Sequence, residues 1–414
     1  SLKGFGVEEN RPGVVAAGVL LEYLALNEQH QAAHITRLYA FDEGRHVLMD
    51  KFTVRNLELL APLHPDGVSF FDVMDRTHSA PGARLLKKWI SFPLRDLASI
   101  MARQRLVTVL KSQKALRDGL QAALKQTGDP ERMLARLATR KISPRECGQL
   151  RTALCAFVRM FEDLEAEAAF GDFLRRRADV TTPIQLLQSR LADEAPSQVG
   201  GAPVIREGFN PALDELRRLK ADGQGVIEDI RRREIERTGI TSLKVNYNRV
   251  FGYYIEITNA NKNKIPSDYI RKQTIANGER FITPELKSWE EKILSAEERM
   301  LTLEQQLFDT LVDDLRAHIP QMQTNALLAA ELDVLCCLAD LAEKRYYAAP
   351  ELTTDYVLDI EEGRHPVIET LLPREQPYVP NSILMNADQQ IMIITGPNMA
   401  GKSALLRQTA LIVL

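Results

Sequence analysis

The chain has little cysteine and no long apolar run. Only four cysteines occur among its 414 residues, at positions 147, 155, 336 and 337, and none stands in a Cys-x-x-Cys pair or near a histidine at metal-ligand spacing. This pattern argues against a disulfide framework or a zinc ribbon and is typical of buried thiols in a reducing cytosol. No stretch approaches the ~18 uninterrupted apolar residues of a membrane-spanning helix, and the first residues do not resemble a secretory signal.

The chain also lacks an excess of either charge. Its 53 basic and 56 acidic residues leave a net charge of −3, which predicts no global attraction to nucleic acid, so that any basic surface must be local. Hydrophobic residues make up 45% and charged residues 26% of the sequence. Those proportions and the length are ordinary for a globular protein of two to four domains with a sizeable core.

Most of the sequence has helical spacing. Residues 12–29 predict one amphipathic helix, which is too short to be a domain, so we interpret 1–48 as the tail of something larger. Residues 52–192 are rich in leucine at helical spacing and predict several helices. The segments 127–130 and 140–144 predict interruptions between them. Residues 195–203, Ala-Pro-Ser-Gln-Val-Gly-Gly-Ala-Pro, have no periodicity and predict a linker.

Two long helices are predicted next. Asn210-Pro211 is a good helix start and Gly239 a good stop, while Gly223 and Gly225 each cost the helix about 1 kcal/mol and permit a bend. A second helix begins at Thr283-Pro284 and meets no glycine or proline before Pro320, a length of roughly 50 Å. Its apolar residues recur every seven positions in two registers, Leu286, Ile293, Met300, Leu307 and Leu294, Leu301, Phe308, Leu315. This heptad seam predicts antiparallel arms that carry residues 239–282 as a small module at their tip.

The module between the arms has strand composition and local positive charge. Residues 242–258 are rich in Val, Ile, Tyr, Phe and Thr, and predict a hairpin around 248–252. Residues 244–280 hold seven basic against three acidic side chains, with Asn259, Asn261, Asn263, Gln273 and Asn277 as neutral donors. The basic residues are Lys244, Arg249, Lys262, Lys264, Arg271, Lys272 and Arg280. Such a patch suits sequence-independent phosphate contacts, with a solvated strand face as the alternative.

A phosphate-binding motif lies near the end of the sequence. The predicted strand 389–395 leads into a stretch that fits G-x-x-x-x-G-K-[ST], formed by Gly396, Pro397, Asn398, Met399, Ala400, Gly401, Lys402 and Ser403. The glycines let backbone N–H groups turn toward phosphate oxygens, Lys402 would reach the outer phosphates, and the Ser403 hydroxyl would ligate Mg²⁺. The acid and the water-positioning group that hydrolysis also needs come from later strands in such folds, so we expect the chain as given not to hydrolyse ATP and name no catalytic residue. His365, which has no positioned partner in the sequence, is interpreted as structural.

Several segments together resemble the MutS family of bacterial DNA mismatch-recognition ATPases. They are FTVRNLEL (52–59), FGYYIEIT (251–258), RKQTIANGERFITPELKSWEEKIL (271–294), EGRHPVIE (362–369) and TGPNMAGKS (395–403). The resemblance implies a mainly α fold, with a helical core, two long antiparallel lever helices, a small β clamp at their tip and the start of an ABC-type α/β ATPase domain. It implies a connector tail over 1–48, core and lever helices over 49–238, the clamp over 239–283, the return lever and core over 284–348, and the truncated ATPase domain over 349–414.

The resemblance also assigns site residues. A family Tyr or Phe that stacks on adenine lies 18 residues before the first loop glycine, where this chain has Tyr378. Family contacts to the DNA backbone point to Asn277, with Arg271, Lys272 and Gln273 as weaker assignments, and Lys262 and Asn261 join them from the charge pattern. This chain has Ala276 where relatives often carry lysine, and Ala404 where they often carry threonine.

Cofactors and partners follow from the family as well. They are ATP or ADP with Mg²⁺, double-stranded DNA with mismatches or small loops, MutL, and a second copy in a homodimer, in a bacterial cytoplasm at the nucleoid and with no membrane partner. The family reads mismatches with an N-terminal Phe-x-Glu motif, and it also has a Walker B acid, a signature motif and a C-terminal helix-turn-helix, none of which we find in this sequence. We therefore expect the sequence as given to bind DNA without mismatch preference.

Three other interpretations remain open on the sequence alone. One is a MutS relative without repair function, such as the branch with a nuclease domain. That branch lacks the clamp, whose sequence is seen here at 251–258. An SMC-like tethering protein would carry its coiled coil after the phosphate loop, whereas here the long helices precede it. The last alternative is a helical scaffold with no activity of its own.

Overall fold

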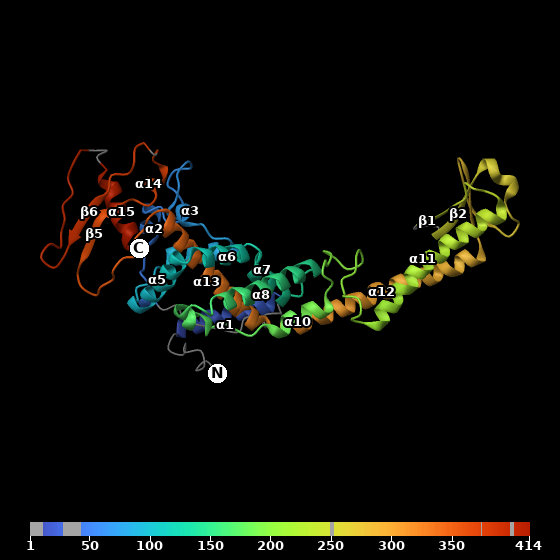
Figure 1. Ribbon diagram of the computed structural model, residues 1–414, viewed down its shortest axis with the longest axis horizontal. Coiled ribbons are helices and arrows are strands. Elements are labelled where there is room, and N and C mark those ends of the chain that lie inside the picture. Colours follow the sequence, from blue (N-terminus) through green and yellow to red (C-terminus); the bar gives the residue numbers. More distant parts are fainter. Residues whose placement is uncertain (1–10, 28–42, 249–251, 374, 398–400) are drawn as a thin grey trace. The chain divides into compact units, whose positions relative to one another are not determined.

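The computed structural model describes residues 11–27, 43–248, 252–373, 375–397 and 401–414, which are mainly helical with two small antiparallel sheets (Figure 1). The chain divides into two compact units. Unit 1 comprises Ser1–Ile142, Gln149–Ile184 and Arg316–Leu414, and unit 2 comprises Ser143–Gly148 and Gln185–Leu315. The mainly α fold class is therefore confirmed. Among the described residues, no helix has both the length and the apolar character needed to cross a membrane.

The first helices belong mostly to unit 1. They are α1 (Arg11–Leu26), η3 (Glu43–Arg45), α2 (Lys51–Asn56), α3 (Phe70–Met74), α4 (Ala80–Ser91), α5 (Leu97–Ser112), α6 (Lys114–Leu124), α7 (Pro130–Ala138), α8 (Pro144–Asp163), η4 (Ala168–Phe170), α9 (Gly171–Leu174) and α10 (Thr181–Arg190). The helical prediction for 12–29 is confirmed as far as Leu26, while residues 28 and 29 lie outside the described residues, and the helical prediction for the leucine-rich stretch is confirmed. The predicted stops at 127–130 and 140–144 coincide with the starts of α7 and α8, each of which begins at a proline.

The core of unit 1 forms around α13 (Ile319–Lys344), which packs against α4, α5, α6 and α7. Most of its circumference is buried, as expected for a helix that is apolar on nearly every side. Cys336 and Cys337 lie in this core, Cys147 is buried and Cys155 is half-buried. Three of the four thiols are thus buried, as the sequence predicted.

A buried carboxylate ties α13 to α4. Asp333 is fully buried and accepts hydrogen bonds from the backbone N–H of His78 (2.9 Å) and of Ser79 (2.8 Å) and from the Ser79 hydroxyl (2.6 Å). Burial raises the pKa of this carboxyl group. Gly82 leaves the space for it, because a Cβ there would lie 2.2 Å from Asp333 Oδ2. The acid therefore fixes where α4 begins on the core helix.

Unit 2 contains the long helices α11 (Pro211–Thr238) and α12 (Pro284–Arg316). As predicted, the Asn210 side chain caps α11 by accepting from the Leu213 N–H, and the helix ends at Gly239 in the left-handed region at φ 67°. Thr283 caps α12 in the same way through Leu286 N–H. The second helix is shorter than the interval to Pro320, because Pro320 lies in the first turn of α13 instead.

The two long helices lie side by side and run antiparallel. Ion pairs join Arg217 to Glu304 at 2.8 Å, Lys220 to Glu297 at 3.0 Å and Arg233 to Glu285 at 2.7 Å, so residue numbers rise along one helix as they fall along the other. At Gly223 the helices approach closely, since a Cβ there would lie 2.6 Å from Ile293 Cγ1. α11 is helical through both Gly223 and Gly225.

The heptad prediction for α12 is correct in part. Leu286 and Ile293 of the first register are buried, and so are Phe308 and Leu315 of the second. Leu294 and Leu301, however, are 36% and 46% exposed. A single partner helix covers only a narrow stripe, and residue 294 lies about 100° around the helix from Ile293. Two adjacent registers therefore cannot both face α11 along the whole length.

A four-stranded antiparallel sheet lies between α11 and α12 in the sequence. Its strands β1 (Lys244–Asn248), β2 (Gly252–Thr258), β3 (Ile270–Ile275) and β4 (Gly278–Ile282) follow the order β1-β2-β4-β3, with the helix η5 (Asn259–Lys264) after β2. β1 and β2 pair from Lys244↔Glu256 to Asn248↔Gly252, which confirms the hairpin, although residues 249–251, including Arg249, lie outside the described residues.

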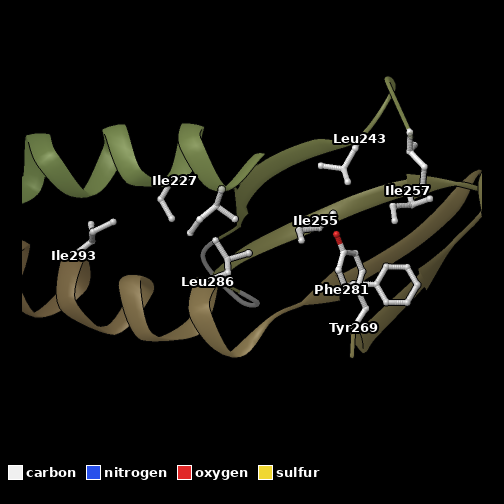
Figure 2. Close-up of a cluster of buried hydrophobic side chains, with 10 residues drawn as sticks. Ile227, Leu243, Ile255, Ile257, Tyr269, Phe281, Leu286 and Ile293 are labelled. Atoms are coloured by element: carbon white, nitrogen blue, oxygen red, sulfur yellow. The ribbon is translucent and has the colours of Figure 1, made fainter. Parts of the chain in front are cut away.

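One apolar cluster joins this sheet to both long helices (Figure 2). Ile255 and Ile257 of β2 and Phe281 of β4 meet Ile227 of α11 and Leu286 of α12. Tyr269 completes the cluster and donates a hydrogen bond from its hydroxyl to Glu234 of α11 at 2.8 Å. Because alternate residues of a strand face opposite sides, the same strands leave their other face polar.

The last part of unit 1 holds β5 (Leu358–Gly363) and β6 (Asn381–Met385), which pair with each other, and the helices α14 (Ile368–Leu371) and α15 (Lys402–Val413). The predicted strand at 389–395 is wrong: these residues have no β structure, and Ile391 and Ile393 are 82% and 83% exposed. A segment rich in apolar β-branched residues forms a strand only where another strand pairs with it. No strand of the described residues pairs with this segment.

Candidate nucleotide loop and DNA-contact surface

The phosphate-loop motif leads directly into α15. Gly401 precedes the helix with φ 82°, a left-handed conformation that favours glycine, and no side chain caps the helix start. The N–H groups of the first turn are thus open to an acceptor, at the positive end of the helix dipole. Ser403 is exposed in this turn. Of the predicted loop residues, Asn398, Met399 and Ala400 lie outside the described residues.

Lys402 folds its side chain back over the loop. Its ammonium donates to the backbone carbonyl of Gly396 and to that of Pro397 at 3.1 Å. The positive charge is therefore held beside the loop backbone, where a phosphate group would lie if the loop cradled one.

Tyr378 contacts the same helix through its hydroxyl group. The Tyr378 hydroxyl donates to Gln408 Oε1 of α15 at 2.7 Å, and the ring lies near His365, with centroids 6.5 Å apart and planes at 58°. The ring is half-buried, and burial raises the pKa of its hydroxyl. The resemblance to a known family placed Tyr378 in the site, but it did not single out Gln408.

His365 has a structural task in this region. Its Nδ1 accepts hydrogen bonds from the backbone N–H of Val367 (3.3 Å) and of Ile368 (3.2 Å), at the start of α14. An accepting nitrogen must be unprotonated, and burial lowers the pKa of the imidazole accordingly. This geometry supports the interpretation of His365 as structural.

The structure brings three of the predicted DNA contacts together. The end of the sheet formed by residues 258–264 and 276–278, here called the distal end, holds Asn261, Lys262 and Asn277. Asn259 links the two segments, because its backbone N–H donates to the Asn277 carbonyl and its side chain to the Ala276 carbonyl, each at 3.1 Å. The opposite end is fixed to α12 through the Tyr253 N–H, which donates to Glu290 at 2.9 Å.

Of the other three predicted contacts, Gln273 and Lys272 lie elsewhere on the sheet, whereas Arg271 shares the carboxylate of Glu279 with Lys262. Gln273 stands in a cross-strand row on the polar face with Lys244, Glu256 and Arg280. Arg280 donates to Gln273 Oε1 at 2.9 Å, pairs with Glu256 at 3.2 Å and covers the Tyr254 ring at 4.4 Å. Gln273 is therefore already engaged within the sheet.

Glu279 reduces the charge that the module offers. This buried acid of β4 pairs with Lys262 at 3.0 Å and with Arg271 at 3.5 Å. Lys272 is exposed at the irregularity in β3 between Arg271 and Gln273. Within the described part of the chain, Lys244, Lys264 and Lys272 make no ion pair. The sequence showed the surplus of basic residues but not which of them are neutralised, because pairing across strands depends on the register.

Comparison with known proteins gives the family. The family described as MutS domain III matches residues 52–339, more than half of the chain. The chain belongs to the MutS family. It is 44% identical over 420 residues to the DNA mismatch repair protein MutS of Flavobacterium johnsoniae, 45% over 417 residues to that of Bacteroides thetaiotaomicron and 46% over 420 residues to that of Porphyromonas gingivalis.

Each of these alignments covers 100% of this chain, but only 48%, 48% and 47% of the relative, respectively. The chain thus spans about half the length of the curated relatives it matches. The predicted resemblance to MutS is confirmed, and the alternatives of an SMC-like tether or a scaffold are not favoured, since the relatives align over the whole chain and are named for mismatch repair.

Proposed function

We propose that this chain is part of an ATP-dependent DNA mismatch repair protein that binds duplex DNA carrying mismatches or small loops. The observation that carries the proposal is similarity along the entire chain to proteins named DNA mismatch repair protein MutS. Within such a protein we assign a connector tail to 1–48, core and lever helices to 49–238 and 284–348, the clamp to 239–283 and the beginning of the ATPase domain to 349–414.

The four-stranded sheet is the proposed DNA clamp. Its distal end holds Asn277 and Lys262 beside Asn261, whose side-chain nitrogen also donates to the Ser242 and Thr258 hydroxyls. Lys264 and Lys272 add charge that no carboxylate of the described residues neutralises. Amides and lysines on a strand module suit contacts to phosphate and sugar, which fix the position of a duplex without reading its sequence. α11 and α12 serve as the levers, because one apolar cluster fastens the sheet to both.

The loop at 396–403 is the proposed site for ATP or ADP. Gly401, the open first turn of α15 and the ammonium of Lys402 fit the phosphate groups, and Tyr378 fits the adenine ring. Among the described residues, no cluster of three or more histidine, cysteine or carboxylate side chains offers a metal site. The loop motif assigns Mg²⁺ to the Ser403 hydroxyl and the phosphate oxygens, whose charge the ion would neutralise.

Partners are proposed from the family alone. A second copy of the protein would form the homodimer, and MutL would be recruited after mismatch recognition, in a bacterial cytoplasm at the nucleoid. These roles are those of a whole MutS protein. This chain spans about half the length of the relatives that it matches.

A mutator assay tests the proposal. We expect deletion of the gene that contains this sequence to raise the frequency of spontaneous mutation, and the intact gene to restore it. A gene with Lys402→Ala should fail to restore it, because the loop loses its phosphate-side charge. The control is Arg175→Ala, which changes an exposed i,i+3 ion pair with Asp172 and should restore fully. An unchanged mutation frequency in the deletion strain would instead favour the scaffold alternative.

A further inference from the structure

Gln408 is an unusual residue for the interior of α15. Its side chain is fully buried, although glutamine is mostly exposed in proteins. It lies six residues after Lys402, or about 9 Å along the helix axis. The proposed loop function does not use it, and burial of an amide is costly unless both of its polar atoms have partners.

Only the oxygen of the Gln408 side-chain amide has hydrogen-bond partners among the described residues. Its Oε1 accepts from the Tyr378 hydroxyl at 2.7 Å and from Asn381 Nδ2 at 3.4 Å. Its buried Nε2 has no hydrogen-bond partner among the described residues. Gly363 leaves room for this nitrogen, since a Cβ at that position would lie 2.7 Å from it. The oxygen of the buried amide therefore holds Tyr378, whereas its nitrogen makes no hydrogen bond among the described residues.

Tyr378 needs such a hold because its own segment is irregular. Residues 377–380 form neither helix nor strand, so the backbone alone does not fix the ring. The hydroxyl bond attaches the ring to the helix that starts at Lys402, and His365 lies beside the ring. Both ends of a bound nucleotide, the phosphates and the base, would then be held by groups attached to one rigid helix.

We propose that Gln408 is a positioning residue that fixes the ring of Tyr378 at a set spacing from the phosphate loop, so that the site prefers a nucleotide with a planar base to a bare polyphosphate. The inference rests on the proposed nucleotide binding at 396–403. The chemistry is that of aromatic stacking: a ring already held in place loses less conformational freedom when a base stacks on it, and so contributes more to affinity.

The experiment is isothermal titration calorimetry of ATP and of inorganic tripolyphosphate on the full-length protein. The variants are Gln408→Met, which keeps the size of the side chain but removes the acceptor, and Tyr378→Phe, which removes only the hydroxyl and is the milder change to the fold. We expect each variant to weaken ATP binding about three- to tenfold, the effect of losing one hydrogen bond, and to leave tripolyphosphate binding unchanged. The double variant should bind ATP no more weakly than the weaker single variant.

Three results would overturn the inference, and they are distinguishable. If the unaltered protein binds neither ligand, the proposed nucleotide site fails and the inference fails with it. If that protein binds ATP and both variants bind it equally well, the site stands but Gln408 does not position the ring. If both variants lose ATP and tripolyphosphate binding to the same extent, Gln408 supports the loop as a whole and does not act through Tyr378.

Discussion

At the scale of single residues, Gly223 and Gly225 stand two positions apart in α11 and meet different surroundings. A Cβ at Gly225 has no neighbour within 4 Å, whereas a Cβ at Gly223 would lie 2.6 Å from Ile293 Cγ1 in the buried cluster. We expect Gly225→Ala to stabilise the protein by up to about 1 kcal/mol through helix propensity. Gly223→Ala should destabilise it, because overpacking costs about 1–3 kcal/mol and exceeds that gain.

Urea denaturation of both variants measures this difference in the free energy of unfolding. The two substitutions are chemically identical and lie in the same helix, so each serves as the control for the other. If both variants gained stability equally, the close approach of α11 and α12 at Gly223 would be contradicted.

His365 predicts a dependence of stability on pH. Burial lowers the pKa of its imidazole below the ordinary 6.5, so in acid the unfolded chain takes up a proton before the folded protein does. The stabilisation is complete above that value and is lost as the pH falls through and below it. His365→Asn keeps a side-chain acceptor for the α14 N–H groups but removes the titration.

The check is the free energy of unfolding of both proteins between pH 7.5 and pH 5. The unaltered protein should lose more stability than the Asn variant over this range. Parallel pH profiles would show that His365 is not held neutral in the fold.

The sequence allowed part of the site to be predicted at this scale. The loop residues follow from a motif, the structural interpretation of His365 follows from the lack of a partner for it in the sequence, and Tyr378 is implied by the resemblance to the MutS family. Gln408 and Glu279 could not be found, because their importance comes from burial and from partners 30 and 8 or more positions away. Neither residue has a local pattern that sets it apart from an ordinary surface side chain.

At the scale of elements, a buried charge holds the α11 and α12 pair to the segment before it. Glu304 of α12 is 4% exposed and accepts from Arg217 at 2.8 Å, from the Val204 N–H at 3.0 Å and from the Ile205 N–H at 3.2 Å. Glu304→Gln should destabilise the protein by about 1.5–3 kcal/mol, because a neutral amide replaces the carboxylate and the bonds from Arg217 and from the Val204 and Ile205 N–H groups lose their charge assistance.

Thermal unfolding of Glu304→Gln measures this effect. The control is Arg175→Ala, since that arginine pairs with Asp172 at an exposed site, where ion pairs contribute little. Equal melting temperatures for Glu304→Gln and the unaltered protein would mean that this network does not stabilise the fold.

Elements were predictable where local chemistry decides them. Asn210, Pro211 and Gly239 mark both ends of α11, because capping needs only residues next to the helix. The prediction of a strand at 389–395 was wrong, and so was the prediction that Leu294 and Leu301 of α12 are buried, for the opposite reason. Strand pairing and helix burial depend on partners that are distant in the sequence.

At the scale of the whole molecule, charge is distributed unevenly. The chain carries a net charge of −3, while residues 244–280 hold seven basic against three acidic side chains. Many helical arginines are paired, for example Arg84 with Asp129 and Glu131, and Arg233 with Glu285. DNA binding should therefore come from the sheet module. Lys272→Glu should make the fall of log affinity with log salt less steep, reducing the magnitude of the slope by about one, which is the value for one phosphate contact.

That slope is measured by fluorescence anisotropy with one duplex at several salt concentrations. Lys114→Glu, in α6 of unit 1, makes the same change of charge outside the sheet and is the control. The assignment of the sheet as the DNA clamp would be contradicted if Lys114→Glu lowered the slope as much as Lys272→Glu did.

The most direct test of the account compares a matched duplex with one that carries a G·T mismatch, both titrated with this chain across a salt series. The account predicts weak binding that falls steeply with salt and is equal for the two duplexes, because the sheet offers backbone contacts and no base-reading element. A clear preference for the mismatched duplex, or binding that ignores salt, would contradict it.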